Sequence, residues 1–187
     1  GSANNATGKT NEADNNTAVG YQALYSNTTG GQNSAYGYFA LSLNTSGINN
    51  SAYGFRALNS NIDGDNNVAI GYNTLPANAT GSGNLALGAY ALGATVSSNN
   101  NIGIGMYALT ELVAGAQNIA IGNDSAEMTA DWNTNSTSSN SIFLGYMTKP
   151  ALSGQVNQIV IGHDASGIGS NTVTLGNNSI VTTALKG

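Results

Sequence analysis

The sequence predicts a mainly β protein, a parallel β-solenoid of about ten coils, from three observations. A five-residue motif recurs every 17 residues over most of the chain. The residues of the motif alternate between two faces, as they do in a β-strand. Each copy ends in glycine and is followed by segments rich in Asn, Gly, Ser and Thr, which form turns. A period near 17 is too short for helix-pair repeats or propeller blades and fits one coil of a stacked solenoid.

The motif reads Asn, a variable residue, Ala, an apolar residue and Gly, as at 67–71 (NVAIG), and we number its positions one to five. Gly replaces Ala in the sixth copy. After a longer seventh unit, the pattern resumes at 141–145, 158–162 and 172–176. Seven copies open with Asn, at Asn16, Asn33, Asn50, Asn67, Asn84, Asn101 and Asn118. Each coil therefore contributes one short strand.

The segment after the glycine favours a helical turn over a second strand. In a strand, Leu24 would share a face with Gln22, whereas a helical turn brings Tyr21 and Leu24 together. A leucine stands four residues after the glycine in six coils, at Leu24, Leu41, Leu58, Leu75, Leu92 and Leu109. The remainder of the coil has turn-forming residues throughout.

The domain organisation follows from where the repeat begins and ends. Residues 1–15 are interpreted as a tag remnant and an N-terminal lead-in, and 16–176 as a single solenoid domain. The seventh unit carries an insertion at about 128–139, and 177–187 form a C-terminal exit segment. Insertions in solenoids project from one face as loops.

The first motif position predicts a structural ladder. Asparagines at the same place in successive coils stack, and their amides can bond to one another along the long axis. A buried asparagine must find hydrogen-bond partners, and the neighbouring coil offers them. A row of ligand-binding amides is the less favoured alternative.

Positions three and four predict that the chain has a partner. Position four is apolar in every coil and is expected to fill the coil, which leaves position three facing outward. Position three is never charged, so we expect another chain to cover it. A ring of three parallel strands is an economical closed arrangement, which predicts a parallel homotrimer. The small residues expected at its axis are Ala18, Ala35, Ala52, Ala69, Ala86 and Ala120.

These repeats resemble those of a known group of fibres. The NxAφG units, φ being apolar, are similar to the head repeats of YadA-like trimeric autotransporter adhesins, and the 17-residue form with GYQAL at 20–24 looks like repeats in phage tail fibre and receptor-binding proteins. The segment 172–179 (TVTLGNNS) resembles the region that precedes an endosialidase-type intramolecular chaperone. The resemblance implies a left-handed β-roll, a trimer, an extracellular place on a bacterial surface or phage tail fibre, and attachment to a receptor, often a glycan.

Composition excludes several other classes of function. Four Lys plus Arg against nine Asp plus Glu leave no basic stripe for nucleic acid. No apolar run approaches the roughly 20 residues of a membrane-spanning helix, so no direct membrane insertion is expected. The lone His163 beside Asp164, with no catalytic motif elsewhere, predicts that the chain is not an enzyme and needs no cofactor. A hexapeptide-type acyltransferase would need three hexapeptide turns in each coil. This chain has only one NxAφG motif in each coil, so that enzyme class is not expected.

Two carboxylates in one turn raise the question of a metal. Asp63 and Asp65, with Asn67 close by, could form an oxygen-rich calcium site. The same residues are typical of any turn rich in Asp and Asn, and this interpretation is favoured.

Candidate ligand contacts lie where the repeat is broken or varies. The only tryptophan, Trp132, stands in the insertion with Asp131, Asn133 and Asn135, either as a carbohydrate contact or as a cap on the swollen coil. Tyr90 and Tyr107 occupy variable positions and are expected to be exposed. A regular aromatic row, at Tyr21, Tyr38, Phe55 and Tyr72, could offer its faces to sugar rings or pack inside the coils, and packing is the favoured interpretation.

The sequence therefore predicts a trimeric adhesive fibre domain that binds a cell-surface receptor or glycan. A purely structural fibre shaft and an ice-binding solenoid are the alternatives. Ice-binding solenoids carry repeated Thr-x-Thr rows, and 172–174 is the only such triplet in the repeat strands.

Overall fold

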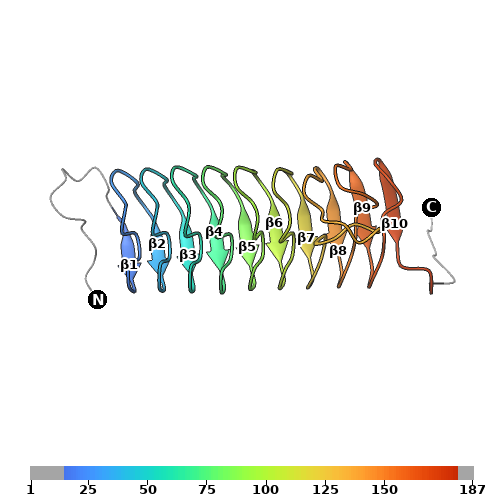
Figure 1. Cartoon of the computed structure of the whole chain (residues 1–187), viewed down its shortest axis with the longest axis horizontal. Coiled ribbons are helices and arrows are strands. Elements are labelled where there is room, and N and C mark those ends of the chain that lie inside the picture. Colours follow the sequence, from blue (N-terminus) through green and yellow to red (C-terminus); the bar gives the residue numbers. More distant parts are fainter. Residues whose placement is uncertain (1–14, 181–187) are drawn as a thin grey trace.

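A computed structural model describes residues 15–180 and shows a parallel β-solenoid, which confirms the predicted fold class. Ten short strands form one parallel sheet in chain order, so nine complete turns separate the first strand from the last (Figure 1). The strands are β1 (Thr17–Val19), β2 (Ser34–Tyr36), β3 (Ser51–Tyr53), β4 (Val68–Ile70), β5 (Leu85–Leu87), β6 (Ile102–Ile104), β7 (Ile119–Ile121), β8 (Ile142–Leu144), β9 (Gln158–Ile161) and β10 (Thr172–Leu175). Most of the predicted N-terminal lead-in and part of the exit segment lie outside the described residues.

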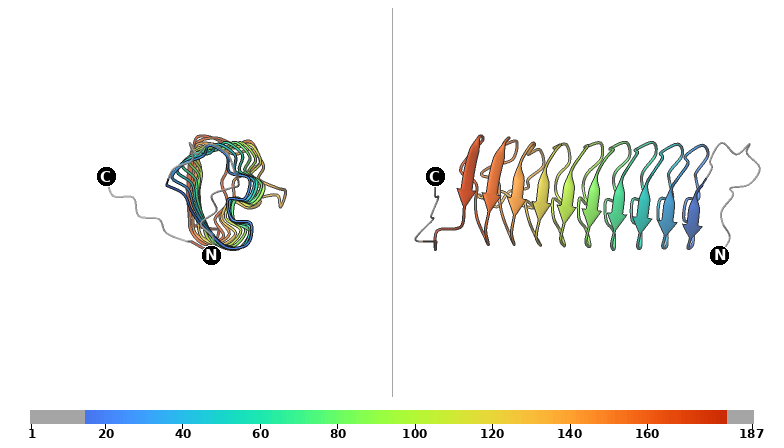
Figure 2. Two further views of the ribbon diagram at one scale, coloured as in Figure 1. Left: turned by 90° about the vertical axis from the view of Figure 1, so that its left-hand side faces the viewer. Right: turned by 180° about the vertical axis from the view of Figure 1, so that it is seen from behind.

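Equivalent motif positions lie directly above one another. Ala35 pairs with Ala52 in the register of β2 and β3, and Tyr36 pairs with Tyr53. Viewed down the long axis, the coils superimpose closely, and one loop projects from the stack (Figure 2). Each motif position therefore forms a straight row along the molecule, and a property of one position becomes a property of a whole face.

The two faces of the strands are opposite to the expectation. Position three points into the coil, and Ala35, Ala52 and Ala69 are fully buried. Position four points outward, and Ile70 and Leu87 are about 40% exposed. The proposed axis residues Ala18, Ala35, Ala52, Ala69, Ala86 and Ala120 are therefore core residues, and their assignment to a trimer axis is wrong.

The leucine that stands four residues after the motif glycine, which we call the corner leucine, explains this orientation. Leucines such as Leu92 are fully buried and fill the narrow coil interior. At Gly103, which occupies position three, an added Cβ would lie 3.3 Å from Leu92 Cγ, so only small side chains fit opposite the leucine. In the coils of β8 and β9 the large core side chain comes from the strand instead, because Phe143 and Val160 are buried where Lys149 and Ser166 stand in place of the leucine.

The expected helical turn after the glycine is also wrong, since residues 15–180 contain no helix. Gln22 and Leu24 both have positive φ, 54° and 51°, and the same left-handed conformation recurs in the following coils. The N–H of Leu24 donates to the Ala40 carbonyl of the next coil at 3.1 Å instead of to a carbonyl one helical turn earlier. Stacking between coils therefore satisfies the backbone that a helix would have satisfied internally.

Candidate functional site

The seven motif asparagines form a continuous hydrogen-bonded ladder. Asn67 is fully buried, and its N–H donates to Asn50 Oδ1 at 2.9 Å. Its Nδ2 donates to the Gly81 carbonyl at 2.8 Å, and its Oδ1 accepts the N–H of Asn84 at 3.0 Å. The same links join Asn16 to Asn33 and Asn101 to Asn118. The hydrogen-bonding groups of these amides are already paired within the solenoid, so the row does not offer a ligand-binding site.

A second ladder, which the sequence analysis missed, runs through the turns. Asn44 Nδ2 donates to Asn27 Oδ1 at 2.8 Å, and Asn61 and Asn78 continue the row. The row ends where Thr95 takes the next place and donates to the Leu112 carbonyl. Asparagine at 27, 44, 61 and 78 repeats with the period of 17, which is the signal that could have revealed it.

The outward side chains at positions two and four form an extended surface that we call the apolar sheet face. Both positions are aliphatic in the six strands β4–β9, and neither is charged in any strand. The first three strands contribute Thr or Ser at position two, then Val19, Tyr36 and Tyr53. At a spacing of about 4.8 Å between strands, the face is roughly 43 Å long. A continuous apolar surface of this kind on one chain indicates an interaction site.

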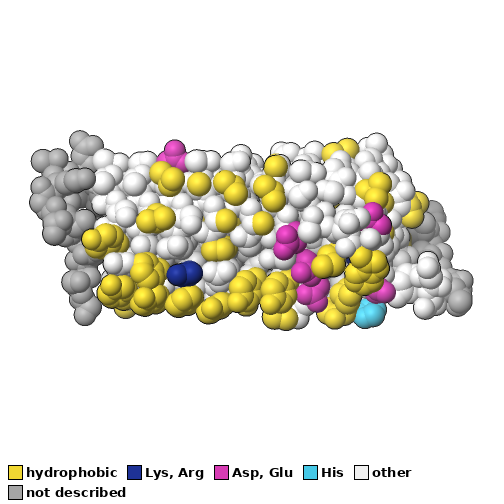
Figure 3. All heavy atoms as spheres, in the orientation of Figure 1, with side chains coloured by type: hydrophobic (Ala, Val, Ile, Leu, Met, Phe, Trp, Pro, Cys, Tyr) yellow, Lys and Arg dark blue, Asp and Glu magenta, His cyan; other side chains and the backbone are white. Residues whose placement is uncertain are grey.

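Aromatic side chains stack along the outside of the coils. Successive ring centroids in the row Tyr21, Tyr38, Phe55 and Tyr72 lie 5.2, 5.4 and 5.1 Å apart. All four side chains are exposed, between 37% and 60%, so the expectation that this row packs inside the coils is wrong. Figure 3 shows hydrophobic side chains gathered along the length of the molecule, with a group of acidic side chains over its C-terminal half.

Tyr90 and Tyr107 extend this aromatic surface. Their rings stack at 5.1 Å, and Tyr90 also meets Tyr72 edge-on at 5.5 Å. Both residues are half-buried by these neighbours and are less open than expected. They therefore form part of the stacked row.

The insertion at 128–139 is a braced loop. Met128 and Thr134 form an antiparallel bridge, and Thr129 N–H donates to the Asn133 carbonyl at 2.8 Å. The Thr129 hydroxyl and Asn133 Nδ2 both donate to the Asp131 carboxylate. These hydrogen bonds hold the pKa of Asp131 below its ordinary value. Asp131 and Asn133 therefore shape the loop that carries Trp132.

Asn135 does not belong to the exposed surface of the insertion. It is fully buried, and its Nδ2 donates to the Ala126 carbonyl at 3.0 Å. Its assignment as a ligand contact is wrong, because the amide fastens the end of the insertion to Ala126, which precedes it in the same coil.

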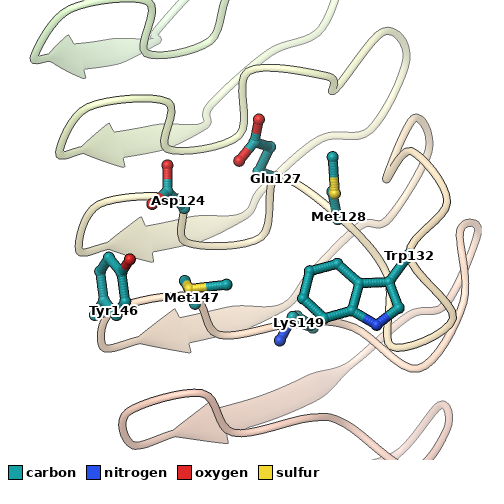
Figure 4. A pocket seen from close by; sticks show the side chains of 7 residues that line it. All are labelled: Asp124, Glu127, Met128, Trp132, Tyr146, Met147 and Lys149. Atoms are coloured by element: carbon teal, nitrogen blue, oxygen red, sulfur yellow. The ribbon is translucent and has the colours of Figure 1, made fainter.

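Trp132 stands over a pocket of about 270 Å³, which we call the insertion pocket (Figure 4). The side chain of Trp132 remains 62% exposed, so it is not a buried cap. Lys149 Nζ lies 4.5 Å from the centroid of the Trp132 ring, in cation–π range. The pocket is lined by Asp124 and Glu127 after β7, Met128 and Trp132 of the insertion, and Tyr146, Met147 and Lys149 after β8.

Lys149 is the residue of this pocket that sequence analysis missed most clearly. It stands four residues after Gly145, where the earlier coils carry leucine, and it is buried. Its ammonium group pairs with the Asp164 carboxylate. This hydrogen bond and the positive charge lower the pKa of Asp164. One of only four basic residues, at a core position of the repeat, was the available signal.

The pocket rim is acidic. Burial raises the pKa of Glu127, and the nearby carboxylates of Asp124 and Glu111 add to the rise. Since Asp164 neutralises Lys149, the carboxylates of Asp124 and Glu127 leave an excess of negative charge.

The remaining titratable candidates have structural partners. His163 stacks against Tyr146 at 5.5 Å, while Asp164 bonds to Lys149. Asp65 of the calcium candidate accepts the N–H of Ile48 at 2.8 Å, and Asp63 is exposed in the same turn. Among residues 15–180, no three His, Asp or Glu side chains gather in a way that could hold a metal ion.

No helix within the described part of the chain is long and apolar enough to span a membrane. Comparison of the chain with protein-family models, curated proteins and solved structures found no match.

Proposed function

We propose that this chain is the subunit of a homotrimeric fibre domain that attaches to a cell-surface glycan or receptor without catalysis, as an adhesin head or a tail-fibre segment. The observation that carries the proposal is the apolar sheet face, which extends over all ten strands and carries no charge. Leaving such a row of aliphatic side chains in water costs about 25 cal/mol for each Å² that a partner would cover.

A second copy of the same chain fits this face best. The side chains of the face repeat at every coil, so a partner must offer apolar groups at the same spacing over the same length. Parallel copies arranged around an axis along the rod meet this condition, because every coil then lies at the height of its equivalents. The resemblance to trimeric adhesin heads favours three copies in a left-handed roll.

Attachment is supported by what remains outside the apolar sheet face. The stacked aromatic row and the insertion pocket both lie on coil segments beyond the strands. A trimer presents three copies of each, and simultaneous binding raises the overall affinity even when each site is weak. The outward strand positions are mainly aliphatic or aromatic and do not form rows of threonine, which argues against an ice-binding surface.

A matched pair of variants tests the proposal. Leu87 on the apolar sheet face and Val96 on a turn are 41% and 44% exposed, so Leu87→Asp and Val96→Asp make similar changes on different surfaces. We expect light scattering to give V96D about three times the 18.8 kDa mass of the chain and L87D a single-chain mass. On a glycan array, L87D should then bind at least about 100-fold more weakly than V96D, because avidity is lost.

The outcomes separate the candidate functions. Equal masses for the two variants would contradict the role of the apolar sheet face. A trimeric V96D that binds neither the array nor intact bacterial or animal cells would identify a structural shaft. Leu87→Asn repeats the comparison with an uncharged side chain in case L87D does not fold.

A further inference from the structure

We propose that the insertion pocket binds the ring of one neutral sugar and rejects acidic sugars. The inference rests on the proposed attachment function and names the class of ligand that one of its sites takes. It is carried by the placement of Trp132, by the apolar lining and size of the pocket, and by the charges at its rim.

The loop holds Trp132 in position before any ligand arrives. The N–H of Trp132 donates to the Thr129 carbonyl at 2.9 Å, and the residue has φ of 64° in the left-handed region. This conformation is unfavourable for a bulky residue and persists only when its surroundings impose it. The bonds among Thr129, Asp131 and Asn133 impose it here. Because the backbone that carries the ring is already fixed, less conformational entropy is lost when a ligand stacks on Trp132.

The lining and volume of the pocket suit a single sugar ring. Met128, Met147 and Tyr146 supply further apolar lining, with Tyr146 at the opposite end of the pocket from the Trp132 ring (Figure 4). Tyr and Trp combine an apolar face with a polar edge, which matches the C–H face and the hydroxyl rim of a pyranose. The volume of about 270 Å³ is below the range of about 300–1,000 Å³ typical of drug-sized ligands. One monosaccharide unit therefore fits better than a longer segment.

The charges decide which sugar is accepted. The carboxylates of Glu127 and Asp124 can accept hydrogen bonds from sugar hydroxyls, but they repel a ligand carboxylate. Lys149 cannot offset this repulsion fully, since its ammonium group is already paired with Asp164. The same ammonium group occupies the cation–π position on one face of the Trp132 ring, so a ligand stacks on the part of this 62% exposed side chain that Lys149 leaves free. A neutral pyranose is the class that satisfies all of these groups.

Intrinsic fluorescence reports directly on this pocket because Trp132 is the only tryptophan in the chain. The full chain is titrated with methyl galactoside, methyl glucoside and methyl mannoside, and separately with glucuronic acid and N-acetylneuraminic acid. We expect a saturable change in the emission of Trp132 with at least one neutral pyranoside at roughly millimolar concentration. The acidic sugars should bind at least about tenfold more weakly.

Variants connect the signal to the named residues. In the double variant D124N/E127Q, the affinity for acidic sugars should rise about tenfold, while that for the neutral sugar changes much less. Ligand-observed NMR should show binding lost in Trp132→Ala and retained in Tyr25→Ala, which removes an exposed aromatic side chain outside the pocket.

The inference is overturned if no neutral pyranoside gives a saturable change up to roughly 100 mM, a concentration at which even weak sites fill. It is also overturned if acidic sugars bind as tightly as neutral ones, or if W132A retains binding. Binding of a monosaccharide to one pocket does not require a trimer. A chain that is trimeric and binds cells but not these sugars would therefore disprove this inference alone, whereas a monomeric chain that binds them would disprove the proposed trimer alone.

Discussion

Replacing Gly54 with alanine is expected to lower the free energy of unfolding by about 4 kcal/mol or more, the range of the most damaging single substitutions. Gly54 ends the third motif and has φ of +136°, a conformation that residues with a Cβ rarely adopt. An added Cβ would lie 2.2 Å from the carbonyl oxygen of Gly71 in the next coil. Because this oxygen belongs to the backbone, the two coils must separate and their ladder hydrogen bonds must lengthen.

The matched control for this variant is Gly169→Ala. Gly169 has a similar φ of +141°, but its nearest atom to an added Cβ is Gln155 Oε1, at 3.9 Å. G169A should therefore cost only the backbone strain, about 1–3 kcal/mol. Chemical denaturation followed by circular dichroism measures both variants. Equal losses of stability would show that close stacking of the motif glycines does not limit the fold.

The second large effect is expected for Asn67→Ala, which should lower the free energy of unfolding by about 1–3 kcal/mol. The substitution leaves the buried N–H of Asn84 without its acceptor. It also removes one of the two donors to the Gly81 carbonyl, which keeps its hydrogen bond from Asn78 Nδ2. A backbone group left buried without a partner costs about 1–3 kcal/mol. Asn67 is fully buried, so water cannot easily take the place of its amide.

Asn99→Ala is the control for the ladder. The Oδ1 of Asn99 accepts the N–H of Ser82 at 2.7 Å, but this bond lies on an exposed turn. Water can replace the lost partner there, so we expect a change within about 0.5 kcal/mol. A loss in N67A no larger than that in N99A would mean that the buried amide ladder does not hold the coils together.

The repeat was enough to locate the ten strands, because the alternating residues and the closing Gly return at each coil and Asn opens seven of the ten motifs. The pattern could not determine which face of the strand is inside. Both Ala35 and Tyr36 belong to uncharged rows, and alternation separates two faces without naming the buried one. The space inside the coil determines which face is buried. That space is limited by Leu41 and its equivalents, whose left-handed backbone directs their side chains into the coil.

The candidate site was predicted only in part for a related reason. Trp132, Asp131 and Asn133 are close in sequence, and the broken repeat revealed them. Tyr146 and Lys149 belong to the following coil and reach the pocket only through stacking. Asn135 shows the opposite case, since a polar residue within an exposed loop turns inward to bond with Ala126.

The most direct test of the central claim, that copies of this chain bury the apolar sheet face against one another, is the mass of the unmodified chain in solution. Light scattering during size-exclusion chromatography should give a single species of about three times 18.8 kDa that persists on dilution to roughly micromolar concentration. A stable, monodisperse species of 18.8 kDa would contradict the account, because the uncharged rows at positions two and four would then remain exposed to water.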